Sequence, residues 1–194
     1  MKQAASYSVS SRNTTFVAVA ASATRVHVVQ STGYVSVLRA DTLALVSNES
    51  YRLPSADAVG GFITGNTLWL MDDTGILHSY VATASQTGQA PGTALAEYNP
   101  LAGNTDLKYP SGVGFSGSHF WMIAYNQASS VQRYQLLGIH AAGASIGQID
   151  STKTLLLSGT LGSAAGGAVT AGRYYFLEYD PTTRRNKVSS LPLP

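Results

Sequence analysis

An Asp-Thr-Gly triplet at residues 73–75 is the first group that could do chemistry, because aspartic proteases use this triplet to hold a catalytic carboxylate. That reaction needs two carboxylates sharing one proton, and the chain carries only one copy. Asp followed by Gly also favours a tight turn, in which Asp caps its own backbone and Gly adopts a positive φ. We therefore interpret residues 72–75 as a hairpin turn.

The histidines are the second group, at His27, His78, His119 and His140. None of them forms a His-Glu-x-x-His motif or a close pair in sequence, so we predict no metal, no cofactor and no catalytic residue. His27 shares its position in an internal repeat with aromatic residues, namely Trp69, Trp121 and Tyr175. It is therefore expected to replace an aromatic ring in the packing.

The repeat itself occurs four times, around residues 20–29, 62–71, 114–123 and 168–177. One of its aligned positions is mostly polar and supplies four candidate binding residues: Arg25, Thr67, His119 and Arg173. If the copies surround a common axis, these side chains come close together. Arginine binds carboxylate and phosphate in a bidentate manner, so an anion is the expected ligand. The alternative is that all four are simply polar residues at strand ends.

Tyrosines supply the other candidate binding residues. Three of the eleven, Tyr34, Tyr80 and Tyr125, fall in or beside expected turns and outer strands. A tyrosine presents an apolar ring and a polar hydroxyl, which suits a protein partner or a sugar. Packing at the edge of the core is the alternative explanation.

The elements that position these residues are β-strands. Each repeat predicts a strand, a tight turn and a second strand, and the second strand does not alternate apolar with polar residues. A sheet with one wet face would alternate, so these central strands are expected to be buried on both faces, as in the stacked blades of a propeller. The central strands are expected at residues 26–29, 68–71, 120–123 and 174–177.

The predicted fold is all-β, a β-propeller-like domain of about four blades of antiparallel strands. The blades cover roughly residues 16–50, 58–100, 110–158 and 165–194. The first blade is expected to end with a strand at 43–46, and residues 94–98 form one strand in an otherwise long loop. A spare strand at 5–10 could complete the fourth blade, which would remove an open sheet edge. Whether the blades close one ring or a second copy completes it stays open.

Two segments of the chain resemble known propeller blades. They begin Val26-His-Val-Val-Gln-Ser-Thr-Gly33 and Asn66-Thr-Leu-Trp-Leu-Met-Asp-Asp-Thr-Gly75. Both are similar to blades of the YVTN and quinoprotein-like β-propellers, which repeat an apolar strand, a turn ending in Gly and a second apolar strand. The resemblance implies the fold and transfers no active site.

Composition limits the function. Charged residues make up 11% of the 194-residue chain and the formal net charge is +2, which argues against nucleic-acid binding. There is no cysteine, no evident secretory signal and no apolar stretch long enough to span a membrane.

We expect a non-catalytic structural or binding module that associates with itself or with other protein subunits, such as a phage tail or virion accessory protein. Virion or extracellular localisation is favoured. The alternatives are a carbohydrate-binding propeller lectin and, third, a hydrolase or oxidoreductase with a site in a central tunnel.

Overall fold

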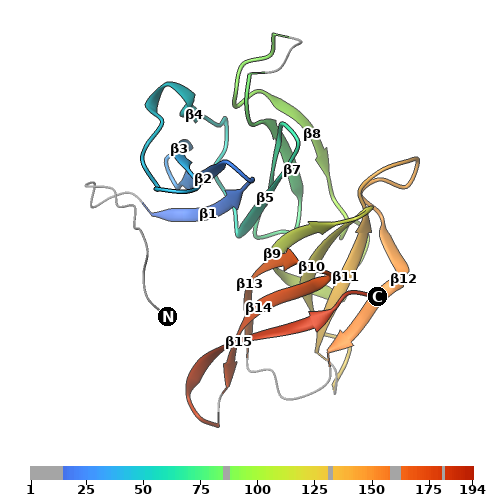
Figure 1. Cartoon of the computed structure of the whole chain (residues 1–194). Coiled ribbons are helices and arrows are strands. Elements are labelled where there is room, and N and C mark those ends of the chain that lie inside the picture. Colours follow the sequence, from blue (N-terminus) through green and yellow to red (C-terminus); the bar gives the residue numbers. More distant parts are fainter. Residues whose placement is uncertain (1–14, 85–87, 131–132, 158–162, 181) are drawn as a thin grey trace. The chain divides into compact units, whose positions relative to one another are not determined.

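The computed structural model describes residues 15–84, 88–130, 133–157, 163–180 and 182–194. These residues form four antiparallel sheets and one short 3₁₀ helix (Figure 1). The fold is thus all-β and β-propeller-like with four blades, as the repeat predicts. Within the described part of the chain, no helix is long and apolar enough to cross a membrane. The described residues form two compact units, one from residues 15–70 and the described part of 78–96, the other from 71–77 and the described part of 97–194.

Blades 1 and 2 are sheets of four strands, each in sequential order. Blade 1 also carries the 3₁₀ helix η1 (Ser47–Glu49). Its strands are β1 (Phe16–Ala21), β2 (Arg25–Gln30), β3 (Tyr34–Arg39) and β4 (Tyr51–Arg52). The strands of blade 2 are β5 (Gly60–Thr64), β6 (Thr67–Met71), β7 (Leu77–Val81) and β8 (Ala94–Tyr98).

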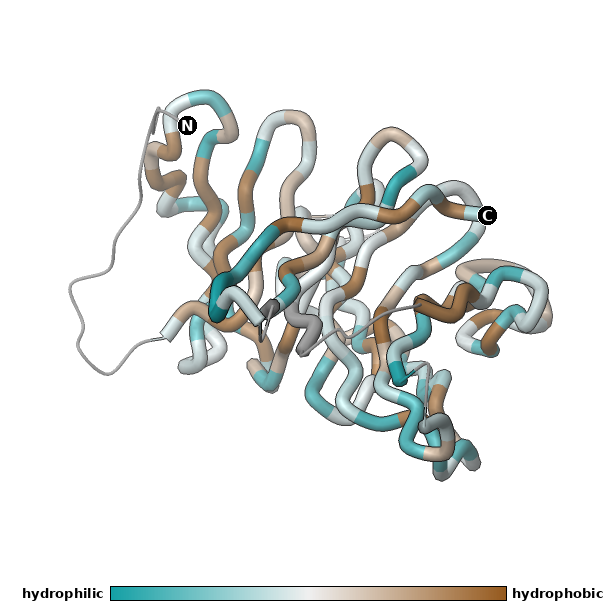
Figure 2. The backbone as a smooth tube through the Cα atoms, turned by 90° about the horizontal axis from the view of Figure 1, so that it is seen from below, coloured by the Kyte–Doolittle hydropathy of each residue, from teal (hydrophilic) through white to brown (hydrophobic). Residues whose placement is uncertain are grey.

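Blades 3 and 4 lie in the second unit. Blade 3 has four strands and blade 4 has three among the described residues. The strands of blade 3 are β9 (Leu107–Ser116), β10 (His119–Asn126), β11 (Tyr134–His140) and β12 (Ile149–Leu157). The strands of blade 4 are β13 (Ser163–Thr170), β14 (Arg173–Asp180) and β15 (Arg185–Pro192). Hydrophobic and hydrophilic stretches alternate along the backbone (Figure 2).

The packing between blades repeats from one unit to the other. In the first unit, Val29 of β2 shares a buried cluster with Leu68 and Leu70 of β6. In the second unit, Trp121 and Ile123 of β10 share a cluster with Tyr174 and Phe176 of β14. The fourth position of the first central strand (29) thus packs with the first and third positions of the next (68/70), and the second and fourth positions of the third (121/123) pack with the first and third of the fourth (174/176). Each blade thus has two different faces.

The central strands of blades 1 to 3 are buried on both faces, as the sequence predicts, but that of blade 4 is not. Tyr174 and Phe176 are 0% and 5% exposed, whereas Leu177 on the opposite face is 50% exposed. Within the second unit, no described residue covers the face of blade 4 that carries Leu177, so burial on both faces is observed for three of the four central strands.

The strand expected at 43–46 is shortened to an antiparallel bridge between Leu45 and Leu38. Two backbone hydrogen bonds flank this bridge, from the Arg39 amide to the Ala44 carbonyl at 2.9 Å and from the Val46 amide to the Val37 carbonyl at 2.8 Å. The amide of Val37 donates to the Ser50 hydroxyl at 3.2 Å, and pairing with β3 resumes at β4. The strand expected at 94–98 is present as β8. The strand proposed at 5–10 lies outside the described residues.

His27 replaces an aromatic residue in the core, as predicted. His27 is only 1% exposed, and its Nδ1 atom lies 3.1 Å from the hydroxyl oxygen of Tyr51. Burial lowers the pKa of His27 to about 4, because the imidazolium ion would lose its hydration.

The folded protein should therefore resist protonation of His27 while the unfolded chain accepts a proton at pH 6.5. The difference in pKa therefore contributes about 3 kcal/mol to the free energy of unfolding above pH 6.5. This contribution is lost as the pH falls toward 4. We expect His27→Phe to flatten the dependence of the free energy of unfolding on pH in this window, measured by urea titration from pH 7 to 4. Parallel pH profiles for the two proteins would contradict the expectation.

Candidate metal centre

Two histidines and an aspartate converge at one edge of blade 3. His119 opens β10, and His140 closes β11 directly opposite it in the same hairpin. Asp150 lies near the start of the next strand, β12, where it pairs with Gly138. The antiparallel ladder thus places these three residues, from successive strands, side by side.

The ligand-type atoms of this cluster lie within 4.8 Å of one another. Nε2 of His119 is 3.1 Å from Oδ2 of Asp150, and Nε2 of His140 is 3.8 Å from the same oxygen. The two imidazole rings are 5.1 Å apart between centroids. The side chains of His119 and Asp150 are 12% and 15% exposed, and that of His140 is 35% exposed. The site is therefore partly buried, with its open side at His140.

Thr152 holds the aspartate in position. Oδ1 of Asp150 accepts hydrogen bonds from the Thr152 amide at 2.9 Å and from its hydroxyl at 2.7 Å. The hydroxyl bond is the main reason that the pKa of Asp150 lies below its usual value, with His119 adding a smaller effect. The carboxylate is therefore ionised at neutral pH, and its second oxygen, Oδ2, is directed at the histidines.

Ser118 fixes the other side of His119. Its hydroxyl oxygen is 3.0 Å from Nδ1 of His119. When a ligating histidine presents one nitrogen to a metal, the other usually donates to an acceptor that sets the tautomer and ring orientation. Ser118 can accept this bond, which leaves the lone pair of Nε2 available to a metal.

The donor set fits a divalent transition metal. Bonds of about 2.1 Å in a tetrahedron separate the ligand atoms by about 3.4 Å, close to the 3.1 and 3.8 Å found at Oδ2. Two imidazoles with one carboxylate suit zinc and other borderline metals. A fourth position is left for water or for a group from another molecule.

The predicted polar column lies as expected at the starts of the four central strands. Arg25 forms a bidentate ion pair with Glu49, with bonds of 2.6 and 2.8 Å. Arg173 donates to the hydroxyl and carbonyl oxygens of Ser190, and Thr67 is half-buried at the start of β6. Arg25, His119 and Arg173 therefore each bind groups of their own blade, which gives the two arginines a structural role.

The three candidate tyrosines lie in different surroundings. Tyr80 is 4% exposed and belongs to the core cluster of the first unit. Tyr34 has the Arg52 guanidinium 6.0 Å from its ring centre. Tyr125 lies between Tyr109 and Tyr134, with ring centroids 6.1 and 5.4 Å away. Tyr109 is 78% exposed, so blade 3 carries the accessible aromatic cluster.

The Asp-Thr-Gly triplet is a turn, as predicted. The Gly75 amide donates to the Asp72 carbonyl, and Gly75 has a φ of 90°. The carboxylate of Asp72 accepts hydrogen bonds from the amides of Thr74 and Ile76. The capping residue is thus Asp72, which lies outside the protease triplet.

Comparisons with known proteins support the fold. No protein-family model matches the sequence, and no significant match is found among curated proteins. Solved propeller structures do match. Glutaminyl cyclase from Myxococcus xanthus has a TM-score of 0.51 at 12% identity over 90% of this chain and 72% of that chain. The U3-55K structure has a TM-score of 0.50 at 9% identity, over 92% and 52%.

The β-propeller domain of Cps50 (Swd1) from Myceliophteria thermophila is also similar, with a TM-score of 0.49 at 14% identity. That match covers 90% of this chain and 53% of the domain. The chain thus spans about half the length of Cps50 and U3-55K. The class of protein that these blades define is a β-propeller, and identities this low show the fold alone.

Sequence reasoning missed His140 and Asp150. Their distances along the chain match no metal-binding motif, because the ligands come from three strands. The register of the β10–β11 hairpin was the available signal, since a strand that starts at one histidine and a partner that ends at another place the two rings opposite each other.

Proposed function

We propose that this chain is a non-catalytic β-propeller binding module that holds a divalent transition-metal ion at His119, His140 and Asp150. The observation that carries the proposal is the convergence of three ligand atoms within 4.8 Å, with Thr152 and Ser118 orienting two of them. Metal bound here joins β10, β11 and β12.

A structural role fits the surroundings better than catalysis. Substrate sites are usually concave pockets with a few convergent polar groups. Two cavities in the second unit, of about 610 and 360 Å³, are lined mainly by residues 99–110, with 147–149 at the larger and Asp73 and Thr74 at the smaller. Neither is lined by His119, His140 or Asp150. The open fourth position would accept water or a group from a bound partner.

We expect Zn²⁺ to bind with one equivalent per chain in isothermal titration calorimetry, and Co²⁺ to give a visible spectrum typical of tetrahedral coordination. His140→Ala should weaken binding by more than about 100-fold, because losing even an outer-shell partner costs 10–100-fold. Zn²⁺ at 100 times its Kd should stabilise the wild-type protein by about 2.7 kcal/mol.

His78→Ala is the matched control, since His78 is a partly buried histidine on β7, outside the cluster. It should leave zinc affinity unchanged. Equal loss in both variants, or no binding by the wild type, would overturn the metal centre.

Association with other protein subunits, as in a phage tail or virion, is the narrower form of the proposal, supported by the low charge and the small polar residues of the chain. Native mass spectrometry of the assembly from its source tests it. Carbohydrate binding is the second candidate, favoured by the exposed Tyr109 beside Tyr125 and the cavity of about 360 Å³ that Tyr109 lines. A glycan array without a binder would remove it.

A further inference from the structure

The backbone of Tyr109, in the second unit, adopts a conformation that is unfavourable for a tyrosine. Its φ is 51°, in the left-handed region, where an L-residue with a bulky side chain is an outlier. The side chain gains little burial in return, because Tyr109 is 78% exposed. Residues held in such conformations cluster at ligand-binding sites, where the surrounding structure fixes them. The strained backbone therefore sets the direction of an exposed ring and does not serve to fill the core.

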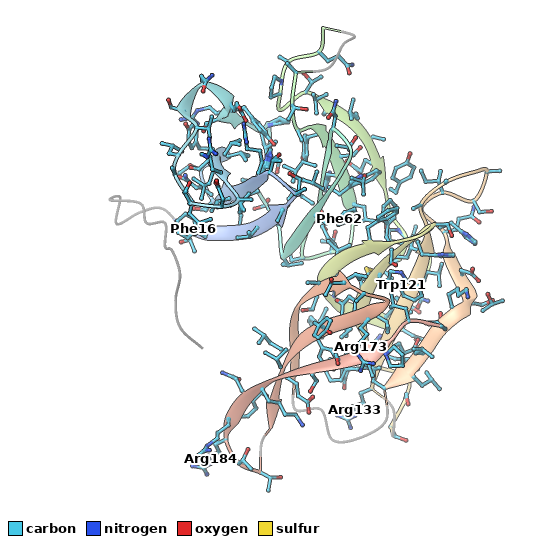
Figure 3. The ribbon with its side chains drawn as sticks, in the orientation of Figure 1. Phe16, Phe62, Trp121, Arg133, Arg173 and Arg184 are labelled. Atoms are coloured by element: carbon cyan, nitrogen blue, oxygen red, sulfur yellow. The ribbon has the colours of Figure 1, made fainter. Side chains whose placement is uncertain are left out.

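The ring of Tyr109 is supported by other aromatic rings of blade 3. Tyr125 of β10 has its ring centroid 6.1 Å from that of Tyr109, and Tyr134 of β11 has its centroid 5.4 Å from that of Tyr125. Tyr134 in turn packs against the buried cluster between blades 3 and 4. Figure 3 draws the side chains of blade 3 and labels Trp121 on β10, the strand that carries Tyr125. Three rings from adjacent strands thus connect the exposed Tyr109 to the core.

Tyr109 also lines the cavity of about 360 Å³ in the second unit. The buried part of the lining is apolar, with Leu101 and Leu107 only 8% and 6% exposed. The exposed part is mostly polar and includes Asp73 and Asn99. An apolar surface with a few polar groups around it is typical of sites for small molecules.

The turn at residues 72–75 places Asp73 at this cavity. The turn lies close against the apolar lining, since a Cβ atom added at Gly75 would be 2.9 Å from the Leu101 side chain. Asp72 supplies the carboxylate that caps the turn. In the described part of the chain, no hydrogen bond to the Asp73 carboxylate is found, so this group is available to a ligand.

We propose that this cavity binds a neutral saccharide, whose apolar C–H face stacks on the Tyr109 ring while its hydroxyl groups bind Asp73 and Asn99. A tyrosine ring is a large apolar surface with a polar edge, and carboxylate and amide groups accept and donate the hydrogen bonds that sugar hydroxyls make. The lining holds one carboxylate and one ammonium group, at Asp73 and Lys108, so a ligand without charge is expected. This inference rests on carbohydrate binding, the second candidate function, and does not depend on the metal centre.

An array of neutral glycans built from glucose, galactose, mannose and N-acetylglucosamine supplies the probes, and calorimetric titration with the strongest binder measures its affinity. Tyr109→Ala should weaken binding by about tenfold or more, because the stacking surface is lost. Tyr109→Phe keeps the ring and should stay within about threefold of the wild type. Asp73→Asn should weaken binding by about tenfold, because it replaces a charged acceptor with an amide while Asp72 still caps the turn.

Tyr179→Ala is the matched control, since Tyr179 is an exposed tyrosine of the same unit that lies on β14 and lines neither cavity. It should leave the affinity unchanged, and urea unfolding verifies that each variant keeps its fold. Equal affinity of Tyr109→Ala and the wild type would overturn this site and leave carbohydrate binding to another part of the chain. An array without a binder would overturn both, while zinc titration of the same protein reports on the metal centre separately.

Discussion

Tyr174→Ala should lower the free energy of unfolding of the second unit by about 4 kcal/mol, within the range found for removing a large buried side chain. Tyr174 is 0% exposed and packs in the cluster that contains Trp121 and Ile123 of blade 3. Its hydroxyl donates to the carbonyl of Gly112 at 3.1 Å and lies 3.3 Å from that of Ser111. Burial raises the pKa of this hydroxyl, so it remains a donor at neutral pH. The variant therefore removes both the packing and the polar link between blades 3 and 4.

Urea unfolding followed by tryptophan fluorescence measures the loss. A Trp69→Phe background leaves Trp121 as the only tryptophan, because the chain has two. Tyr174→Phe should lower the free energy of unfolding by about 1–2 kcal/mol. This variant keeps the ring but removes the hydroxyl that donates to the buried carbonyls. Tyr109→Ala is the control. Tyr109 is 78% exposed, and its removal should cost less than about 1 kcal/mol. A loss as small for Tyr174→Ala would show that blade 4 does not depend on this contact.

Gly112→Ala should also be strongly destabilising, by more than about 3 kcal/mol. Gly112 on β9 has a φ of 60°, and a Cβ atom there would meet the backbone of Gly166 and Gly167 on β13. A positive φ costs an L-residue about 1–2 kcal/mol. The collision with a neighbouring backbone adds to this cost, because a strand cannot move aside as the end of a flexible side chain can. The first strands of blades 3 and 4, β9 and β13, would be forced apart.

Gly117→Ala separates the two effects. Gly117 has nearly the same φ, 63°, but nothing lies within 4 Å of an added Cβ. Gly117→Ala should lower the free energy of unfolding only by the cost of the positive φ, about 1–2 kcal/mol. The difference between the two variants, measured by urea unfolding, reports the collision alone. Equal losses would contradict the close approach of β9 and β13.

The sequence predicted the blades because each repeat carries its own local signals. The central strands are rich in aromatic and β-branched residues, and turns such as 72–75 hold Asp and Gly where capping and positive φ are needed. Blade 1 departs from the expected pattern because residues 44–46 pair with β3 over a single bridge, between a positive φ at Leu43 and the start of the 3₁₀ helix at Ser47. A leucine at positive φ and a single turn of 3₁₀ helix leave no periodic signal, so the shortening of this strand could not be foreseen.

The candidate site depended on information that the repeat does not hold. His119 was recognised as a polar residue at the start of a central strand, but its partners His140 and Asp150 come from strands outside the aligned region. Their juxtaposition follows from the register of the β10–β11 hairpin and of its pairing with β12, which the aligned repeat does not include.

The inequality of the two faces of a blade gives the chain a direction. In the second unit, the face of blade 3 that carries Trp121 and Ile123 packs against a different face of blade 4, the one that carries Tyr174 and Phe176. Such a contact is heterologous, because the two surfaces that meet are not alike. Exchanging the order of these two blades along the chain would therefore bring together faces that do not fit each other.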